Sequence, residues 1–316
     1  LASDGILPAG PMGDTPAPKD ANHREPGPPM INAIARLHDQ AVDFAATNAY
    51  SESFLRRELA HLIELVQYRE LIRNLVARDL KVRYRDSVLG FVWCLLNPLM
   101  MMAVFTVVFT VMMKSSIPNF PVFILVGILA WNLHSASISG SIMCIIGSSS
   151  LVMRVYFPRE VLPIAVVLSN TVNYLLALIV LFAMVAVFGV QLSATLAFLP
   201  LILLVQVTFS LGLAFILSAL TVKFRDVGII TEALMLAWFF LTPIFYRIED
   251  LFPLYARLMY ILNPMASIIS AYRDVLYHGG MPGLDFLGRT AVTSFIILVA
   301  GYAFFRRASR RFGEEL

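Results

Sequence analysis

Two ionisable side chains fall inside long uncharged runs of this sequence, and they are the first candidates for chemistry. His134 stands close to Asn132 and Ser135, and Glu232 lies near the start of a later run. A proton- or ion-coupled transporter needs ionisable groups at membrane depth. Glu232 is expected near a membrane face, and a lone histidine among polar neighbours favours hydrogen-bonded packing. The sequence therefore favours packing over a proton relay, which stays the alternative for His134.

Nucleotide, metal and covalent chemistry also lack the residues that they need. A phosphate-binding loop of the Walker A type places a lysine directly after a glycine, and no lysine of this chain has a glycine before it. Cys94 and Cys144 lie in apolar runs without a metal-binding spacing. No carboxylate pair or nucleophile–base arrangement indicates an enzyme. We therefore expect no catalytic residue, no metal and no cofactor in this chain.

The composition indicates an integral membrane protein. Of the 316 residues, 59% are hydrophobic and only 14% are charged, with a mean hydropathy of +0.77. A soluble domain carries about 25% charged residues. The net charge of +3 gives no indication of nucleic-acid binding. A membrane transporter without an ATP site must take its energy from another polypeptide.

The chain divides into four predicted segments. Residues 1–50 contain a Pro-rich stretch that cannot bury a core, so we expect a disordered cytoplasmic extension. Residues 51–86 hold a cytoplasmic amphipathic helix region. Residues 87–305 hold the membrane spans, and residues 306–316 form a basic cytoplasmic tail.

Uncharged runs predict an all-α fold with six transmembrane helices, at about 20 residues per crossing. Six crossings place both termini on one side, whose flanks carry far more Lys and Arg than the other side. The positive-inside rule makes that side cytoplasmic, in the plasma membrane. The expected spans are 87–113, about 123–145, two within 161–222 separated at 189–193, 227–246, and 290–305.

An amphipathic helix is predicted over residues 68–86, directly before the first span. Apolar residues share one half of this helix, although Arg69, Asp79 and Arg83 interrupt that half. A basic amphipathic helix that leads into a span fits a helix lying in the membrane surface. A helix packed on a soluble domain is the alternative. The basic residues assigned to this interface helix are Arg73, Arg78, Lys81 and Arg85.

The cytoplasmic connection at 155–163 is the best candidate contact for an energy-supplying partner. Pro158 suits the first turn of a helix, and Glu160 complements a helix N-terminus. Tyr156 and Phe157 are expected to be exposed beside Arg159, which gives an aromatic anchor with a charge. A membrane-interface anchor without a partner is the alternative. A second, weaker candidate is the 223–226 connection, with Lys223 and Arg225.

Residues 246–288 are expected on the outer side between spans five and six. The segment is too long for a tight turn and too apolar for a free loop. Short helices that re-enter the outer leaflet fit this pattern, with ordinary surface helices as the alternative.

Aromatic residues recur along the uncharged spans. Such faces would let sugar rings slide past without tight binding sites. The same residues could instead pack between helices or form interfacial belts. The candidate channel-lining residues are Phe91, Phe105, Phe109, Trp131, Tyr174, Trp238 and Phe239.

Several segments resemble one family of membrane proteins. The segment Leu75 to Trp93, followed by Asn97-Pro98, is similar to the opening of polysaccharide-export permeases of the type-two ABC exporter class. This class includes the Wzm-type O-antigen and galactan permeases and the teichoic acid permeases. The 155–163 segment resembles their coupling helix. Residues 241–246, Asn263-Pro264 and 272–274 resemble their fifth span and re-entrant outer helices.

The resemblance implies a homodimeric channel with two separate ATP-binding cassette subunits, which would bind ATP and Mg. It also implies a lipid-linked polysaccharide as cargo, with membrane lipids around the chain and no nucleic acid. A drug or lipid exporter permease of the same architecture is the alternative. A membrane-embedded glycosyltransferase or acyltransferase would need a carboxylate or histidine pair at a membrane face, which the sequence lacks.

Overall fold

The computed structural model describes residues 67–84, 92–112, 117–154, 157–251 and 254–312. The chain separates into two units, Leu1–Ile63 and Glu64–Leu316, and the described residues all belong to the second. The extension predicted at 1–50 lies outside them.

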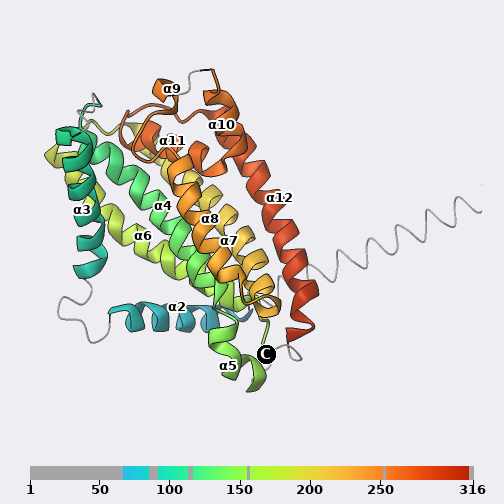
Figure 1. Ribbon diagram of the computed structural model, residues 1–316. Helices are drawn as coiled ribbons and strands as arrows, with labels where there is room; N and C mark the ends of the chain where they lie inside the picture. The colour runs from blue at the N-terminus through green and yellow to red at the C-terminus, as the bar shows by residue number, and fades with distance from the viewer. Residues whose placement is uncertain (1–66, 85–91, 113–116, 155–156, 252–253, 313–316) are drawn as a thin grey trace, which may run out of the picture. The chain divides into compact units, whose positions relative to one another are not determined.

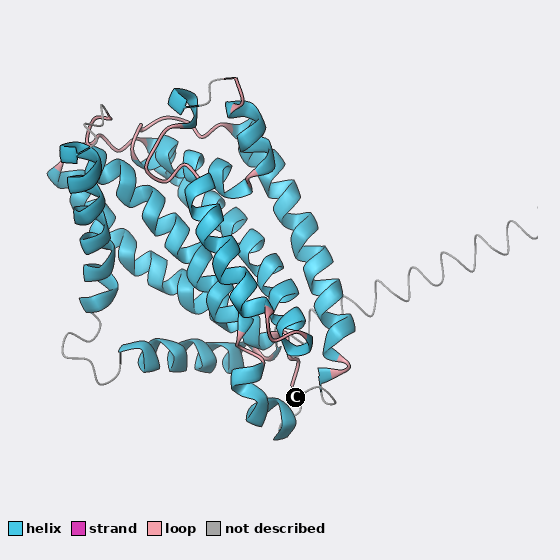
Figure 2. Ribbon diagram, viewed as in Figure 1, coloured by secondary structure: helices cyan, strands magenta, loops and turns pink. Residues whose placement is uncertain are grey.

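Every regular element in the described ranges is a helix (Figure 2). In chain order these are α2 (Arg69–Tyr84), α3 (Val92–Thr106), the π-helix η1 (Val107–Met112), α4 (Phe120–Ile142), the 3₁₀ helix η2 (Ile146–Ser148), α5 (Ser149–Arg154), α6 (Val161–Val187), the 3₁₀ helix η3 (Ala194–Phe198), α7 (Leu199–Lys223), α8 (Val227–Leu241), α9 (Ile248–Leu251), α10 (Ala256–Leu262), α11 (Pro264–Leu276) and α12 (Leu284–Ser309).

Four of the described helices are long and apolar enough to cross a membrane. They are α4, α6, η3 together with α7, and α12. Two further apolar helices are shorter, at Leu95–Phe109 and Val227–Leu241. The all-α membrane fold class is therefore confirmed, whereas the six-crossing layout stays a prediction.

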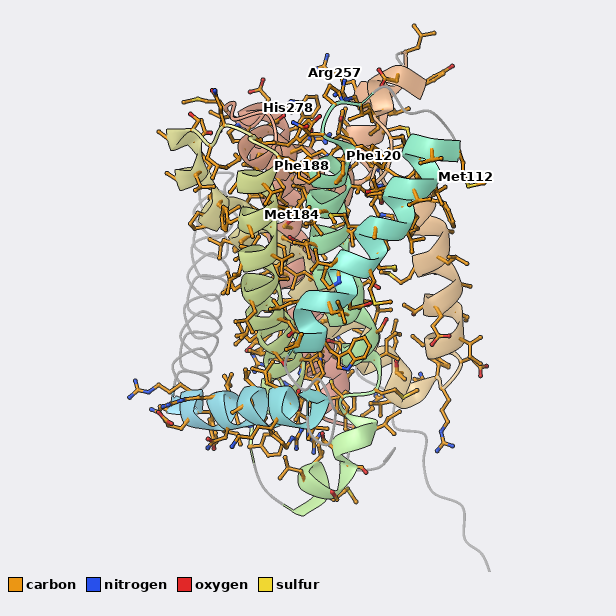
Figure 3. All side chains as sticks on the ribbon, turned by 90° about the vertical axis from the view of Figure 1, so that its left-hand side faces the viewer. Met112, Phe120, Met184, Phe188, Arg257 and His278 are labelled. Carbon is orange, nitrogen blue, oxygen red and sulfur yellow. The ribbon has the colours of Figure 1, made fainter. Side chains whose placement is uncertain are left out.

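The helix α4 lies at the centre of the bundle and is buried over most of its length. It packs against α3, α6, α7, α8 and α11, while α12 packs on α7 and α2 packs on α6. The helices α2 and α5 lie at one end of this bundle, and α9, α10 and α11 lie at the other (Figure 1). The side-chain view agrees, because Phe120, Phe188, Arg257 and His278 all lie at the end opposite α2 (Figure 3).

The predicted break within 161–222 is present. The helix α6 ends at Val187, and Gly189 follows with φ +65°. A residue in this left-handed conformation just beyond a helix end is usually glycine, because glycine has no Cβ to clash. Pro200 lies in the first turn of α7. Backbone N–H groups in that turn have no acceptor within the helix, so proline loses no helical hydrogen bond there.

The helix α8 is shorter than the predicted 227–246 span. It ends at Leu241, and Thr242 is extended with ψ 134°. Proline disfavours the α conformation in the residue before it, so Pro243 explains the end of the helix. At 1.5 Å per residue, α8 is about 22 Å long. The hydrocarbon core of a bilayer is about 30 Å thick, so its outer end is expected inside the membrane.

The helices α7 and α12 approach each other at two glycines. A Cβ on Gly301 would lie 2.3 Å from the Gly212 carbonyl oxygen, and a Cβ on Gly212 would lie 2.7 Å from the Leu298 nitrogen. Small residues allow such close backbone approach between helices in a membrane.

We expect Gly301→Ala to force α7 and α12 apart and to lower stability by about 1–3 kcal/mol, as overpacking does. The measurement is thermal unfolding of the purified full chain in detergent. Gly288→Ala is the matched control on α12, because a Cβ there meets nothing within 4 Å. Equal unfolding temperatures for both variants would contradict the close-packing explanation.

Candidate functional site

The amphipathic helix predicted before the first span is α2. Its Leu75 is buried, and Tyr68, Leu71 and Ile72 pack against the same apolar cluster. Val82 belongs to the apolar half of the predicted helix, but it is 67% exposed, because it lies near the end of α2 and outside that cluster. Of the predicted basic residues, Arg73, Arg78 and Lys81 are exposed, and Arg85 lies outside the described residues.

The candidate contact at 155–163 differs from its prediction. Phe157 was expected to be exposed, but it is 6% exposed and belongs to the buried cluster of Leu75, Phe305 and Phe312. Burial against α2 and α12 supplies it with apolar partners inside the chain. Tyr156 lies outside the described residues.

The turn that follows Phe157 is tied to the end of α12. Arg159 donates a hydrogen bond from Nη1 to the Ser309 carbonyl, and its guanidinium lies 5.8 Å from the centre of the Phe312 ring. Pro158 precedes α6 instead of occupying its first turn, since the helix starts only at Val161. Glu160 is the N-cap residue of α6 and makes no side-chain capping hydrogen bond.

Two other parts of the same end of the bundle are more exposed. At the α7–α8 turn, Lys223, Phe224 and Arg225 are all exposed, and the Lys223 ammonium lies 5.2 Å from the Phe224 ring centre. The short helix α5 projects beyond α2 (Figure 1) and exposes Met153. Sequence reasoning missed α5, although an uncharged run too long for one span ended there.

The C-terminal end of α8 is held by Asn263, the N-cap residue of α11. The Asn263 Oδ1 accepts hydrogen bonds from Trp238 Nε1 at 2.9 Å and from the Met265 nitrogen at 3.1 Å. Its Nδ2 donates to Thr242 Oγ1 at 3.0 Å. One side chain thus caps α11 and bonds the last turn of α8. Sequence reasoning quoted the Asn263-Pro264 pair without this role, although asparagine before proline is a helix-start signal.

A second contact from α11 holds the chain just beyond α8. Arg273 is buried and donates to the carbonyls of Pro243 at 2.6 Å and Ile244 at 2.5 Å. Its guanidinium lies 3.6 Å from the Phe123 ring centre on α4, a cation–π geometry. We use the name outer clamp for Asn263, Arg273 and the carbonyls of Leu241, Pro243 and Ile244 that they bond.

His278 lies close to the outer clamp at the end of α11. Burial lowers its pKa, the positive charges of Arg247 and Arg273 act in the same direction, and Asp274 opposes them. These surroundings favour the neutral form of His278.

The aromatic candidates separate into two groups. Phe105, Phe109 and Phe239 are partly exposed and surround Phe245, with a Phe109–Phe245 ring distance of 5.0 Å. Trp238 is partly exposed as well. Phe91 lies outside the described residues.

Trp131 and Tyr174 do not fit a channel-lining role. They are 6% and 5% exposed and contact Phe239 and Tyr272 within the chain. The alternative, packing between helices, holds for these two because neighbouring helices cover both rings.

His134 is also packed between helices, as expected. Its Nδ1 lies 2.8 Å from Ser210 Oγ on α7, and its ring stacks on Phe209 at 5.3 Å. In the described part of the chain, no group of three or more His, Cys, Asp or Glu residues could hold a metal ion.

Comparison with known proteins identifies the family. The family described as ABC-2 type transporter matches residues 70–277. The chain is 39% identical over 254 residues to the O-antigen export system permease protein RfbA of Myxococcus xanthus, which covers 80% of this chain and 98% of that protein.

Two further relatives have related names. An O-antigen export system permease protein RfbA of Klebsiella pneumoniae is 30% identical over 248 residues, covering 78% of this chain and 95% of that protein. The polysialic acid transport protein KpsM of Escherichia coli is 23% identical over 243 residues, covering 74% and 92%. The resemblance to type-two ABC exporter permeases is thus confirmed, and the chain belongs to the ABC-2 type transporter family.

Proposed function

We propose that this chain is the permease subunit of an ATP-driven exporter that moves a lipid-linked polysaccharide across the plasma membrane. The observation that carries this proposal is 39% identity, over 98% of its length, to a protein named as an O-antigen export permease. An O-antigen-like, galactan or teichoic acid polymer fits the same class. The ATP and Mg bind to a separate ATP-binding cassette subunit.

The geometry supports a layout with six crossings and both termini in the cytoplasm. The six apolar helices are α3, α4, α6, α7, α8 and α12. The amphipathic α2, the α7–α8 turn and the end of α12 gather at one end of the bundle, and α9 to α11 gather at the other (Figure 1). This arrangement agrees with the positive-inside rule when the end that carries α2 and the α7–α8 turn is cytoplasmic.

A homodimer is supported by the surface of α3 and α8. Both helices expose large apolar side chains, among them Val104 and Leu236. Glu232 is also exposed on α8, together with these apolar side chains. A carboxylate that faces lipid is costly, although less so near a membrane face, where Glu232 is expected. A face of α8 that borders a second copy and a water-filled passage would remove this cost.

The cargo predicts a specific phenotype. Depletion of this chain in its native cells should leave a lipid-linked glycan accumulating on the cytoplasmic face, because assembly continues while export stops. The measurement is extraction and analysis of lipid-linked glycans beside surface glycan. A normal surface glycan with changed drug sensitivity would favour the drug or lipid exporter instead.

The coupling contact is best tested at the α7–α8 turn. Phe157 is buried and Arg159 is bonded to α12, so changing them would disturb folding as well as coupling. We expect Phe224→Ala with Arg225→Ala to weaken ATPase copurification. Truncating an aromatic or arginine anchor costs about 2 kcal/mol, roughly thirtyfold in affinity.

The matched control is Arg257→Ala with Leu258→Ala. It removes one exposed arginine and one exposed apolar residue at the opposite end of the bundle (Figure 3). In this control variant, ATPase copurification, ATP hydrolysis and export should match wild type. Loss of copurification in the control alone would place the ATPase at the other end and reverse the proposed topology.

The outer clamp gives a graded prediction. Asn263→Ala removes the N-cap acceptor of α11 and the bonds to Trp238 and Thr242, and should lower stability by about 1–2 kcal/mol and reduce export. Asn263→Asp keeps the acceptor and loses only the donor, so its loss should be smaller. Thermal unfolding and export are measured on both variants. Equal effects would show that capping is not what holds α8.

A further inference from the structure

A groove runs between α2 and the neighbouring ends of α4 and α6. Its larger part has a volume of about 570 Å³ and is lined by Arg78, Arg83, Gly140, Gly147 and Ser169, among others. A second part of about 250 Å³ shares Arg78, Gly140 and Gly147 with the first, so the two are continuous. No role described above uses this space.

The larger part of the groove is positively charged. Arg78 lies 3.3 Å from Asp79, which offsets its charge. Asp79 also lines the groove, but among the described residues Arg83 forms no ion pair with it, and the Arg83 Nη2 donates to Asn170 Oδ1 at 3.0 Å. That bond occupies one donor of a guanidinium that has five. The groove therefore keeps one net positive charge and free donors.

A buried hydroxyl faces the same part of the groove. Ser169 is 1% exposed, lines the groove, and its Oγ has no hydrogen-bond partner among the residues that the structure describes. A buried hydroxyl without a partner costs free energy, so a bound group that hydrogen bonds it would recover that cost. Asn170, which positions Arg83, is 3% exposed and donates its own Nδ2 to the Val166 carbonyl at 3.0 Å.

The second part of the groove is mainly apolar. Leu75, Met143, Leu162 and Ala165 line it beside the shared residues. An adjoining cationic part and apolar part match an amphiphile with an anionic head and a hydrocarbon chain. The position beside the amphipathic α2 is where lipid headgroups lie when such a helix rests in the membrane surface.

We propose that this groove binds the phosphate or diphosphate headgroup of a membrane lipid, held by Arg83 and Ser169. The headgroup comes from an anionic phospholipid of the bilayer or from the lipid carrier of a polymer. Only the second source rests on the proposed function. Arginine suits this ligand because its planar donors match phosphate oxygens.

The test is native mass spectrometry of the purified full chain in detergent, titrated with single lipids. The probes are phosphatidylglycerol, undecaprenyl diphosphate, and diacylglycerol as a lipid without phosphate. Arg83→Gln should weaken headgroup binding about tenfold or more by removing a charge-assisted bond. Ser169→Ala should weaken it less.

Two more variants separate the groove from the general charge of α2. Gly147→Leu keeps every charge but fills the space, since a Cβ on Gly147 meets nothing within 4 Å. It should abolish binding. Arg73→Gln is the matched control, because Arg73 lies on α2 outside the groove with an 80% exposed side chain. It should bind as wild type, and thermal unfolding confirms that each variant is folded.

The outcomes also identify the source of the headgroup. Binding of phosphatidylglycerol alone assigns the site to the bilayer, and binding of the diphosphate alone assigns it to a polymer carrier. The proposal is overturned if diacylglycerol binds as tightly as both phosphate lipids, or if Arg83→Gln and Gly147→Leu bind as wild type. These titrations need neither ATPase nor export, so their failure leaves the export proposal standing.

Discussion

The carbonyl groups at the end of α8 set the strongest constraint on this structure. A helix that stops within a membrane leaves carbonyls that water cannot reach, and each unbonded group costs several kcal/mol. Thr242 Oγ1 and the Tyr246 hydroxyl donate to the carbonyls of Trp238 and Phe240, and α11 supplies further donors. Asn263 donates to Thr242 Oγ1 and the Leu241 carbonyl, and Arg273 donates to the carbonyls of Pro243 and Ile244 just beyond α8. The short α8 is possible because α11 returns into the bundle beside it.

A buried arginine carries a desolvation cost that its neighbours must offset. The two carbonyls and the face of Phe123 surround the Arg273 guanidinium. Space for it comes from Gly127 on α4, where a Cβ would lie 3.0 Å from Arg273 Nη2 and 3.0 Å from the Ile244 carbonyl oxygen. Packing at the centre of the bundle therefore depends on the outer clamp. A side chain at position 127 would crowd both the Arg273 guanidinium and the Ile244 carbonyl.

Much of the fold follows from hydropathy and a few breaking residues. Uncharged runs predicted the apolar helices, and Gly189 marked the break between α6 and α7. Pro243 also indicated the end of α8. The predicted span of 227–246 extended beyond it because that prediction rested on uncharged residues alone. Burial of Phe157 could not be predicted, because it depends on a cluster that brings together Leu75 of α2 and Phe305 of α12, both distant from Phe157 in sequence. The sequence could not distinguish the buried Trp131 from the partly exposed Trp238, because tertiary packing decides which aromatic side chain is exposed.

The helix α8 joins the two ends of the bundle directly. It starts at the exposed turn of Phe224 and Arg225 and ends at the outer clamp. Between them it contacts α4 and carries Trp238 and Phe239, whose rings meet Trp131. A hydrogen-bonded helix of about 22 Å moves as one body, so a displacement of the turn displaces the clamp as well. Were a partner ATPase seated on this turn, α8 would be the shortest covalent route from ATP hydrolysis to the aromatic residues and to the helices that cover the outer end.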